Sequence, residues 1–431
     1  MTSAALLTDK YELTMLAAAL REGTAGRRTT FEVFTRSLPD GRRYGVTAGT
    51  ARFLDALRDF AFDDDAMRSV AGFLDPATCE FLRGFRFGGD IDGYPEGELY
   101  FPGSPVLSVT GTFAECVLLE TLALSVFNHD CAVASAAARM VSAADGRPLI
   151  EMGSRRTHER AAVAAARAAY IAGFAGTSNL AAHHRYGIPA LGTAAHAFTM
   201  LHTRPGADTD EWERDAFRAQ IAALGVGTTL LVDTYDVRAG VANAIAVAGP
   251  QLGAVRIDSG DLGMLTRQVR EQLDALGATG TRIVVSGDLD EYAIAALRAD
   301  PVDSFGVGTS VVTGSGAPTA GMVYKLVEVD GLPVQKRSSR KESHGGRKAA
   351  TRSARASGTI IEEIVHPIAA PPAIAETSRV VTVPLMRRGE VVTDTGLTGA
   401  RERVADGLRS LPWEGLALSH GEPAVITRRI P

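Results

Sequence analysis

The feature that most constrains the fold of this chain is a repeated rhythm between residues 149 and 310. Short apolar runs end in a polar or glycine-rich cluster, and a helix-like stretch follows most of them. The clusters are Gly153-Ser154-Arg155-Arg156, Gly176-Thr177-Ser178-Asn179, Gly192-Thr193-Ala194-Ala195-His196, Asp233-Thr234-Tyr235-Asp236, Asp258-Ser259-Gly260-Asp261, Ser286-Gly287-Asp288-Leu289-Asp290 and Gly306-Val307-Gly308-Thr309-Ser310. Alternating strands and helices predict a parallel sheet with right-handed crossovers. Seven such units in tandem favour a barrel-like (β/α) array over an open sheet.

The segments on both sides of this array mix helix and strand. Residues 9–20 are expected to form a helix, and aromatic and β-branched residues predict strands at 31–36 and 98–109. Further strands are expected at 322–329, 334–336 and 379–385. Residues 336–355, rich in Arg, Lys, Ser and Gly, form either a mobile solvated loop or a flap that closes over phosphate. A chain of 431 residues exceeds the roughly 250–300 residues that one core supports, so two or three domains are expected.

Charge, cysteine spacing and hydropathy exclude several classes of protein. The net charge of −5 and the lack of an extended basic face argue against a nucleic-acid partner. The three cysteines have no CxxC spacing, which suits a reducing compartment and argues against disulfides or structural zinc. Charged and polar residues interrupt the longest apolar region, 113–144, which predicts a buried helical hairpin or a long core helix rather than a membrane span. Because the N-terminus also lacks signal-peptide character, we expect a cytoplasmic protein that does not enter a membrane.

One histidine and two aspartates follow predicted strands, at the rim where barrel enzymes place their active sites. His196 has no second histidine or carboxylate at zinc-ligand spacing, so it is either a structural residue or a nucleophile or acid–base group. Asp233 and Asp258 end two successive apolar runs. A carboxylate in this position can orient an imidazole, or it can bind a cation or a ribose hydroxyl. Asp261 has the simpler explanation of capping the next helix.

Glycines and arginines at the same rim indicate a phosphorylated substrate. Gly287 with Asp288, and Gly308 with Thr309, follow the last two strands of the array, where barrels bind phosphate through backbone N–H groups. Arg155, Arg156 and Arg256 add guanidinium groups that suit phosphate or carboxylate. Together with the aspartates they point to a phosphorylated substrate that binds with Mg²⁺.

Missing motifs narrow the chemistry further. No GxxxxGK[ST] occurs, so ATP would not be held by a P-loop. No lysine lies between Lys10 and Lys325, which disfavours a Schiff-base aldolase. No GxGxxG follows an early strand, which disfavours a dinucleotide-binding oxidoreductase.

Several of these segments together resemble the nicotinate phosphoribosyltransferases. The N-terminal segment of the resemblance is Leu7-Thr8-Asp9-Lys10-Tyr11-Glu12-Leu13-Thr14-Met15, followed by Leu118-Leu119-Glu120-Thr121. It continues through the clusters that contain Arg155, Ser178, His196, Asp258 and Thr309, in consistent order over about three quarters of the chain. Met152 departs from the pattern, because the family often has an aromatic residue there.

The resemblance implies a fold, a reaction and an assembly. The fold is α/β, with an incomplete (β/α) barrel-like domain at 126–320. An open-faced α/β sandwich domain is formed by the N-terminal segment 1–125 and the C-terminal segment 321–431. The reaction joins nicotinate to phosphoribosyl pyrophosphate, giving nicotinate mononucleotide and pyrophosphate for NAD biosynthesis. The family couples this to ATP hydrolysis, with Mg²⁺, and works as a head-to-tail homodimer with shared active sites.

The resemblance also implies a role for each matching residue. His196 would be the phosphorylated histidine, Asp233 would orient it, and Asp258 would hold the ribose hydroxyls. The residues implied in substrate binding are Tyr11 from the neighbouring subunit, Arg155, Ser178, Thr193, Arg256, Gly287, Asp288, Gly308 and Thr309. No protein ligand for a metal is implied.

Two alternatives remain open at the level of sequence. A relative of the same fold could use nicotinamide or quinolinate; Ser178 argues against nicotinamide, because amide-preferring relatives have an aspartate there, which repels a carboxylate. A catalytically silent homologue could bind metabolites, but the joint presence of His196, Asp233, Arg256 and Asp258 argues against it.

Overall fold

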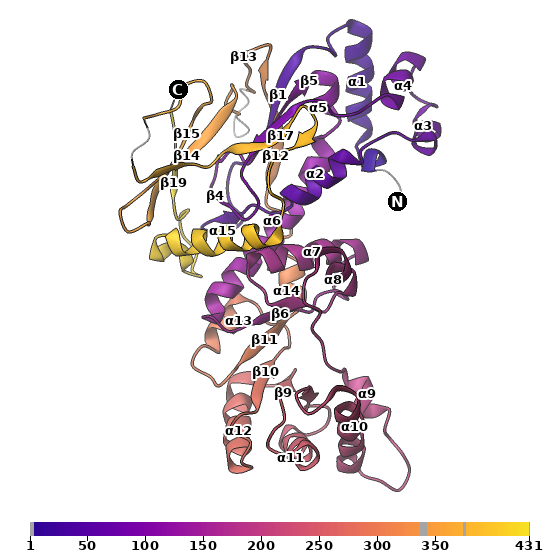
Figure 1. Cartoon of the computed structure of the whole chain (residues 1–431), viewed down its shortest axis with the longest axis vertical. Coiled ribbons are helices and arrows are strands. Elements are labelled where there is room, and N and C mark those ends of the chain that lie inside the picture. Colours follow the sequence, from indigo (N-terminus) through magenta and orange to yellow (C-terminus); the bar gives the residue numbers. More distant parts are fainter. Residues whose placement is uncertain (1–3, 337–342, 374–375, 431) are drawn as a thin grey trace. The chain divides into compact units, whose positions relative to one another are not determined.

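The computed structural model describes residues 4–336, 343–373 and 376–430 (Figure 1). The chain forms two compact units. One consists of Met1–Ser135 together with Ala317–Pro431, and the other of Ala136–Gly316. The sequence-based boundaries were residues 125 and 320, so the observed unit boundaries lie inside the segment predicted for the barrel-like domain.

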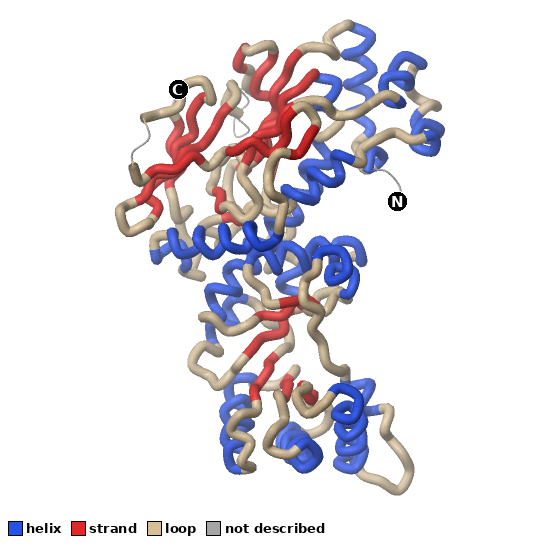
Figure 2. Tube along the Cα trace, viewed as in Figure 1, coloured by secondary structure: helices blue, strands red, loops and turns tan. Residues whose placement is uncertain are grey.

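The second unit is built on a six-stranded parallel sheet with the order β7-β6-β11-β10-β9-β8. Its strands are β6 (Leu149–Glu151), β7 (Gly176–Thr177), β8 (Thr229–Leu231), β9 (Ala254–Ile257), β10 (Arg282–Val285) and β11 (Ser304–Val307). Figure 2 shows the short strands at the centre of this unit with helices outside them. The sheet curls into a half-barrel, so the predicted α/β fold class with an incomplete barrel is confirmed.

Helices connect these strands, and short polar side chains begin most of them. The helices are α7 (Glu159–Ala172), α8 (Leu180–Tyr186), α9 (His196–Met200), α10 (Thr209–Leu224), α11 (Val237–Ala248), α12 (Leu262–Ala275), α13 (Glu291–Ala296) and α14 (Thr309–Val312). Asp236 and Asp261 accept hydrogen bonds from the first turns of α11 and α12. Asp290 does the same for α13, so three of the rim aspartates are helix caps. Asp233 and Asp258 cap no helix and are available to bind a ligand.

One of the seven predicted strands is wrong. Residues 188–191, which precede the His196 cluster, form only an isolated parallel bridge between Thr177 and Ala190. Pro189 lies inside this run and has no N–H to donate to a neighbouring strand. The regular sheet therefore ends at β7, and a loop carries the chain from there to α9.

The first unit contains a seven-stranded sheet with the order β13-β12-β1-β5-β3-β17-β18. Its strands are β1 (Arg28–Thr35), β3 (Asp90–Gly93), β5 (Leu107–Thr112), β12 (Met322–Val329), β13 (Leu332–Pro333), β17 (Val383–Arg387) and β18 (Glu390–Val391). A pair of short strands, β2 (Gly45–Val46) and β4 (Leu99–Tyr100), lies apart from it. N-terminal and C-terminal segments thus share one sheet, and the predicted strand 322–329 coincides with β12.

Helices of the same unit bury an apolar core with this sheet. They are η1 (Ala4–Leu6), α1 (Lys10–Glu22), α2 (Thr50–Arg58), α3 (Asp64–Val70), α4 (Pro76–Arg83), α5 (Phe113–Val117) and the N-terminal part of α6 (Glu120–Ala144), whose last residues belong to the second unit. Two further helices of the first unit, α15 (Leu397–Ser410) and η2 (Trp413–Leu416), follow β18 in the chain. Helix α6 is the long core helix that the interrupted apolar region predicts. Among the described residues, none of the helices combines the length and apolar character needed to cross a bilayer.

A four-stranded sheet corrects two expectations about the C-terminal third. Its order is β16-β14-β15-β19, with β14 at Lys348–Ala354, β15 at Ile360–Pro367, β16 at Ser378–Val380 and β19 at Ile426–Arg429. The basic loop predicted at 336–355 is therefore wrong over 348–354; its residues 337–342 lie outside the described residues. Arg352 is buried in β14 because Glu98 and Glu363 each pair with its guanidinium at 2.6 Å. The single strand predicted at 379–385 is divided between β16 and β17, which belong to different sheets.

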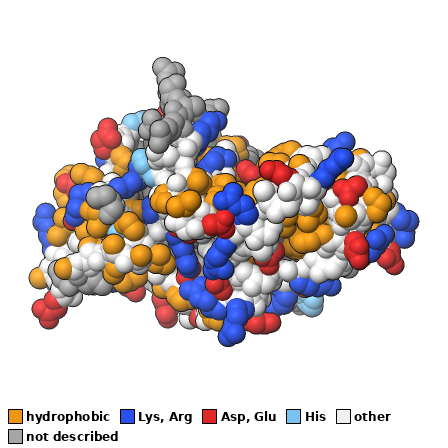
Figure 3. All heavy atoms as spheres, turned by 90° about the horizontal axis from the view of Figure 1, so that it is seen from above, with side chains coloured by type: hydrophobic (Ala, Val, Ile, Leu, Met, Phe, Trp, Pro, Cys, Tyr) orange, Lys and Arg blue, Asp and Glu red, His pale blue; other side chains and the backbone are white. Residues whose placement is uncertain are grey.

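The surface carries both signs of charge. Figure 3 shows Lys and Arg side chains intermixed with Asp and Glu over the face that it presents. This mixture fits the small net charge of −5.

Candidate active site

Two adjoining pockets open at the carboxyl ends of the parallel strands in the second unit. The larger, of about 340 Å³, is lined by Met152, Ser154, Arg155, Ser178, Gly192, Thr193, Ala194, Ala195, His196, Leu231, Arg256 and Asp258. The smaller, of about 150 Å³, is lined by Met152, Arg155, Arg156, Arg256, Asp258, Ser286, Gly287, Asp288, Gly306, Gly308 and Thr309. Met152, Arg155, Arg256 and Asp258 line both, so a single ligand can occupy the two pockets at once.

His196 is the first residue of α9 and has a half-exposed imidazole at the wall of the larger pocket. Its Nε2 lies 4.0 Å from a carboxylate oxygen of Asp233 and 4.0 Å from one of Asp258. Its Nδ1 lies on the other side of the ring, 3.2 Å from the Thr234 hydroxyl. The two ring nitrogens therefore face different surroundings: carboxylates at Nε2 and a neutral hydroxyl at Nδ1.

Asp233 is a buried carboxylate fixed behind this histidine. Its side chain is 1% exposed, and Oδ2 accepts hydrogen bonds from the Asp258 backbone N–H at 2.8 Å and the Ser259 hydroxyl at 2.7 Å. Its Oδ1, the oxygen nearest His196, has no hydrogen-bond partner among the described residues. A buried carboxylate oxygen without a donor favours a proton on the facing imidazole nitrogen.

Asp258 and Arg256 form a fixed ion pair at the junction of the pockets. Arg256, on β9, donates from Nη2 to Asp258 Oδ1 at 2.7 Å and from Nε to the Ser286 hydroxyl at 2.8 Å. Ser286 in turn donates to the same oxygen of Asp258. Burial acts to raise the pKa of Asp258, but the Ser286 hydrogen bond and the Arg256 charge outweigh it, so the pKa lies below its ordinary value. Asp258 is therefore ionised at neutral pH.

Backbone geometry shapes the smaller pocket. Gly287 has φ +108°, and a Cβ there would lie 2.3 Å from the carbonyl oxygen of Asp258, so only glycine fits. Asp288, next along the chain, also has a positive φ of 47°. Gly308 and Thr309 follow β11 on the opposite wall. This pocket has exposed backbone and three arginines, which suits a phosphate group.

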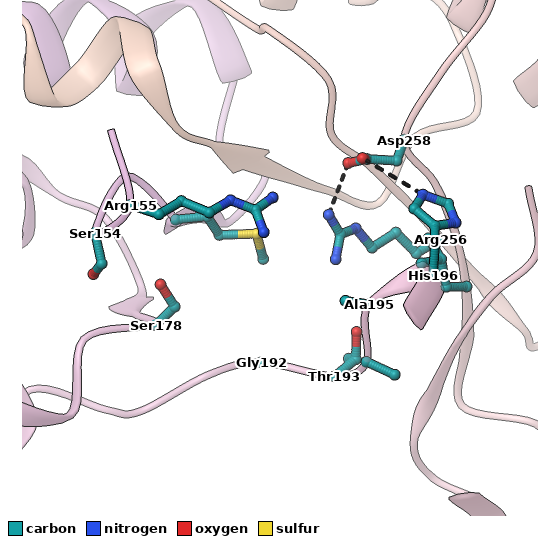
Figure 4. A pocket seen from close by; sticks show the side chains of 12 residues that line it. Ser154, Arg155, Ser178, Gly192, Thr193, Ala195, His196, Arg256 and Asp258 are labelled. Atoms are coloured by element: carbon teal, nitrogen blue, oxygen red, sulfur yellow. Dashed lines mark hydrogen bonds and ion pairs between the residues drawn. The ribbon is translucent and has the colours of Figure 1, made fainter. Parts of the chain in front are cut away.

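The other residues that the sequence predicts to bind substrate lie around the larger pocket. Figure 4 shows Arg155 and Arg256 extending towards each other across it, with Ser154 and Ser178 on the Arg155 side and His196 on the Arg256 side. Thr193 lies on the loop that leads to α9. In place of an aromatic residue, Met152 forms part of the wall, with its sulfur packed against Gly306.

Tyr11 belongs to the other unit, where it lies on α1 with 44% of its surface exposed. Burial, followed by the negative charges of Glu120 and Glu12, raises the pKa of Tyr11 above its ordinary value. Its phenol is therefore neutral at physiological pH.

Sequence reasoning missed several residues of the site. Ser286, which ties Arg256 to Asp258, looked like an ordinary turn residue. Thr234 at the histidine and Ser154 in the wall belong to the strand-end clusters but were not singled out, and Leu231 has no sequence signal of its own. Ser286 could have been found because it occupies the same strand-end position as Asp258 in the neighbouring unit of the array.

Comparison with known proteins gives consistent matches over both units. Family models match twice: the nicotinate phosphoribosyltransferase (NAPRTase) N-terminal domain over residues 6–128, and the nicotinate phosphoribosyltransferase family over residues 148–359. The chain is 74% identical over 428 residues to nicotinate phosphoribosyltransferase pncB1 of Mycobacterium tuberculosis, covering 99% of this chain and 96% of that protein. It is 33% identical over 424 residues to human nicotinate phosphoribosyltransferase, covering 84% and 79%. The crystal structure of human nicotinic acid phosphoribosyltransferase is similar over 97% of both chains, with a TM-score of 0.83 and 28% identity.

Proposed function

The chain belongs to the nicotinate phosphoribosyltransferase family, an enzyme family of NAD biosynthesis, and from this premise we propose that it couples nicotinate mononucleotide synthesis to ATP hydrolysis through phosphorylated His196. The observation that carries the proposal is the pair of pockets that share Arg256 and Asp258. One pocket fits a flat acid and the other fits a phosphate. The ribose that joins them would lie at the shared residues.

The larger pocket suits the nicotinate ring and its carboxylate. Arg256 uses Nε and Nη2 for Ser286 and Asp258, which leaves Nη1 for a ligand oxygen. Charge-assisted hydrogen bonds from guanidinium to carboxylate are among the strongest available to a small ligand. Thr193 and the Met152 side chain would complete the polar and apolar parts of the wall.

The bond-forming step needs negative charge near the ribose more than it needs a general base. The nicotinate ring nitrogen bonds to C1′ of the ribose while the bond from C1′ to the pyrophosphate oxygen breaks, and that electron pair leaves with pyrophosphate. C1′ is cationic in between. Asp258, ionised and fixed by Arg256 and Ser286, would hold the ribose hydroxyls and stabilise this charge.

Phosphorylation of His196 would take place at Nδ1. A phosphoryl group at Nε2 would meet the carboxylates of Asp233 and Asp258, and like charges repel. With a proton on Nε2 facing these carboxylates, the lone pair of Nδ1 can attack the γ-phosphorus of ATP and ADP leaves. Hydrolysis of the phosphohistidine then returns the free imidazole and phosphate.

Mg²⁺ would enter with the substrates. Over residues 4–336, 343–373 and 376–430, no group of three or more His, Cys, Asp or Glu side chains is arranged to hold a metal ion. Mg²⁺ binds readily through substrate phosphates and few protein ligands. We therefore assign it to the pyrophosphate of phosphoribosyl pyrophosphate and to ATP.

A homodimer would supply the second wall of the nicotinate site. Tyr11 and Met15 lie one turn apart on α1 and are 44% and 38% exposed, and Leu7 just before the helix is 68% exposed. An apolar face of this kind is typical of a surface that another chain covers. The Tyr11 ring would stack on nicotinate bound to the partner subunit.

Product analysis tests the proposal. Purified protein is incubated with nicotinate, phosphoribosyl pyrophosphate and Mg²⁺, with and without ATP, and nicotinate mononucleotide is measured by mass spectrometry. We expect product with both substrates and a higher yield with ATP. Product formation that is indifferent to ATP would remove the coupling from the proposal.

A further inference from the structure

A buried carboxylate outside both pockets connects two of the loops that line them. Glu151, the last residue of β6, is 0% exposed. One of its oxygens accepts the backbone N–H of Gly153, and the other accepts the hydroxyl of Thr177. Gly153 begins the loop that carries Arg155, and Thr177 begins the loop that carries Ser178. Each loop is therefore tied to the same side chain.

The contacts around Glu151 close into a network. The Thr177 hydroxyl accepts the backbone N–H of Asn179 at 2.9 Å, and the Asn179 amide donates to the Ser154 hydroxyl at 3.0 Å. The backbone N–H of Ser178 donates to the carbonyl oxygen of Glu151 at 2.8 Å. Every one of these bonds joins residues 151–154 to residues 177–179 or lies within one of these segments.

Gly153, at the start of the first loop, is closely packed and leaves no space for a side chain. A Cβ on Gly153 would lie 2.2 Å from Val312 Cγ1 and 2.9 Å from the carbonyl oxygen of Gly308. The N–H of Gly153 therefore points at Glu151 from a tightly packed position. Moving it would leave two buried polar groups without partners.

The two side chains that face the substrate have no anchor of their own. In the described part of the chain, neither the Arg155 guanidinium nor the Ser178 hydroxyl has a hydrogen-bond or ion-pair partner, although both line the larger pocket. Their positions depend on the backbone that carries them. That backbone is held by Glu151.

We propose that Glu151 is a positioning residue for the nicotinate pocket, which fixes Arg155 and Ser178 relative to each other without touching the substrate. Burial raises the pKa of Glu151, and the hydrogen bonds from Thr177 and Gly153 offset part of that rise. A side chain with two acceptor oxygens suits this position, because the Gly153 N–H and the Thr177 hydroxyl donate to different oxygens of Glu151. The inference rests on nicotinate as the substrate.

The test measures two quantities in each variant: KM for nicotinate and the rate of ATP-dependent labelling of His196. Thr177→Val removes the hydroxyl that joins Glu151 to the second loop, and Thr177→Ser keeps it. We expect Thr177→Val to raise KM for nicotinate about tenfold or more, because the hydroxyl takes part in two hydrogen bonds, to Glu151 and from the Asn179 N–H. ATP-dependent labelling of His196 should keep its rate. Thr177→Ser should restore the wild-type KM. Glu151→Met, which removes both acceptors at similar volume, should raise KM further.

Thr281→Val is the matched control. Thr281 is equally buried in the same unit, and its hydroxyl donates to the Leu252 carbonyl oxygen at 3.0 Å, away from both pockets. Loss of stability without change in KM is expected there. Equal KM in wild type and Thr177→Val, or the same KM change in Thr281→Val, would overturn the inference. If the wild type itself makes no nicotinate mononucleotide, the proposed function fails instead, and direct nicotinate binding by calorimetry still decides the role of Glu151.

Discussion

Glu213 on α10 gives a quantitative prediction of how stability depends on pH. Its side chain is 1% exposed, and one oxygen accepts the Asn243 amide N–H at 3.0 Å. Its other oxygen has no hydrogen-bond partner among the described residues. Burial and then the charges of Asp210, Asp236 and Asp233 raise the pKa of Glu213 from 4.5 to about 7, against the opposing effect of Asn243.

The direction in which stability changes with pH follows from the protons bound by the folded and unfolded states. Between pH 4.5 and about 7 the folded protein keeps a proton on Glu213 that the unfolded chain has lost, so stability falls as pH rises through this range. At about 1.4 kcal/mol per pKa unit, the full shift is worth roughly 3 kcal/mol. Glu213→Gln removes this titration, because the amide accepts from Asn243 and stays neutral at every pH.

The assay is calorimetric unfolding of wild type and Glu213→Gln at pH 5, 6, 7 and 8. At roughly 2–4 °C of Tm per kcal/mol for a unit of this size, the mutant should gain about 5–10 °C over the wild type between pH 5 and pH 8. Glu271→Gln, an exposed glutamate on α12, controls for the chemical change alone. A Tm difference that is the same at pH 5 and pH 8 would refute the burial argument.

Three further predictions concern the site. Ser178→Asp places a negative charge in the nicotinate pocket, so kcat/KM for nicotinate should fall at least tenfold relative to nicotinamide, and an unchanged ratio would mean that Ser178 does not face the substrate carboxylate. Mixing inactive Tyr11→Ala with inactive His196→Ala should restore part of the activity through hybrid dimers; a mixture that stays inactive although subunits exchange argues against shared sites. Gly287→Ala should raise KM for phosphoribosyl pyrophosphate about tenfold or more, because the added Cβ would displace the turn at Asp258. Gly277→Ala is the control: Gly277 also has a positive φ, of 74°, but open space around it, so KM should not change. Equal effects of the two substitutions would assign the change to backbone strain alone.

The parallel array could be predicted because each of its units is recognisable from a short stretch of sequence. Each strand is a short apolar run, and the polar cluster that ends it must lie at the same edge as the others in any parallel sheet. Arg256 and Asp258 could therefore be assigned to one site from sequence, and the structure joins them by a hydrogen bond of 2.7 Å. The same reasoning failed at residues 188–191, where Pro189 removes a donor and the sheet has already ended.

The errors lie where long-range pairing decides the structure. Residues 348–354 look like a solvated loop because they carry Arg and Lys, yet Arg352 is buried by carboxylates from distant segments, Glu98 and Glu363. Glu151 looks like an ordinary strand residue, since its partner Thr177 is 26 positions away. The sequence shows that a residue is charged but not which distant residue pairs with it. Buried ion pairs and positioning carboxylates therefore could not be predicted from the sequence.

Phosphate transfer from ATP to His196 can be measured directly. Wild type, His196→Ala and a control variant at the exposed His184 are incubated with γ-labelled ATP, and the label is located by mass spectrometry of peptides under basic conditions. We expect acid-labile, base-stable label at Nδ1 of His196 in the wild type and in His184→Ala, and none in His196→Ala. Label of equal amount in His196→Ala, or its absence from an active wild type, would contradict this expectation.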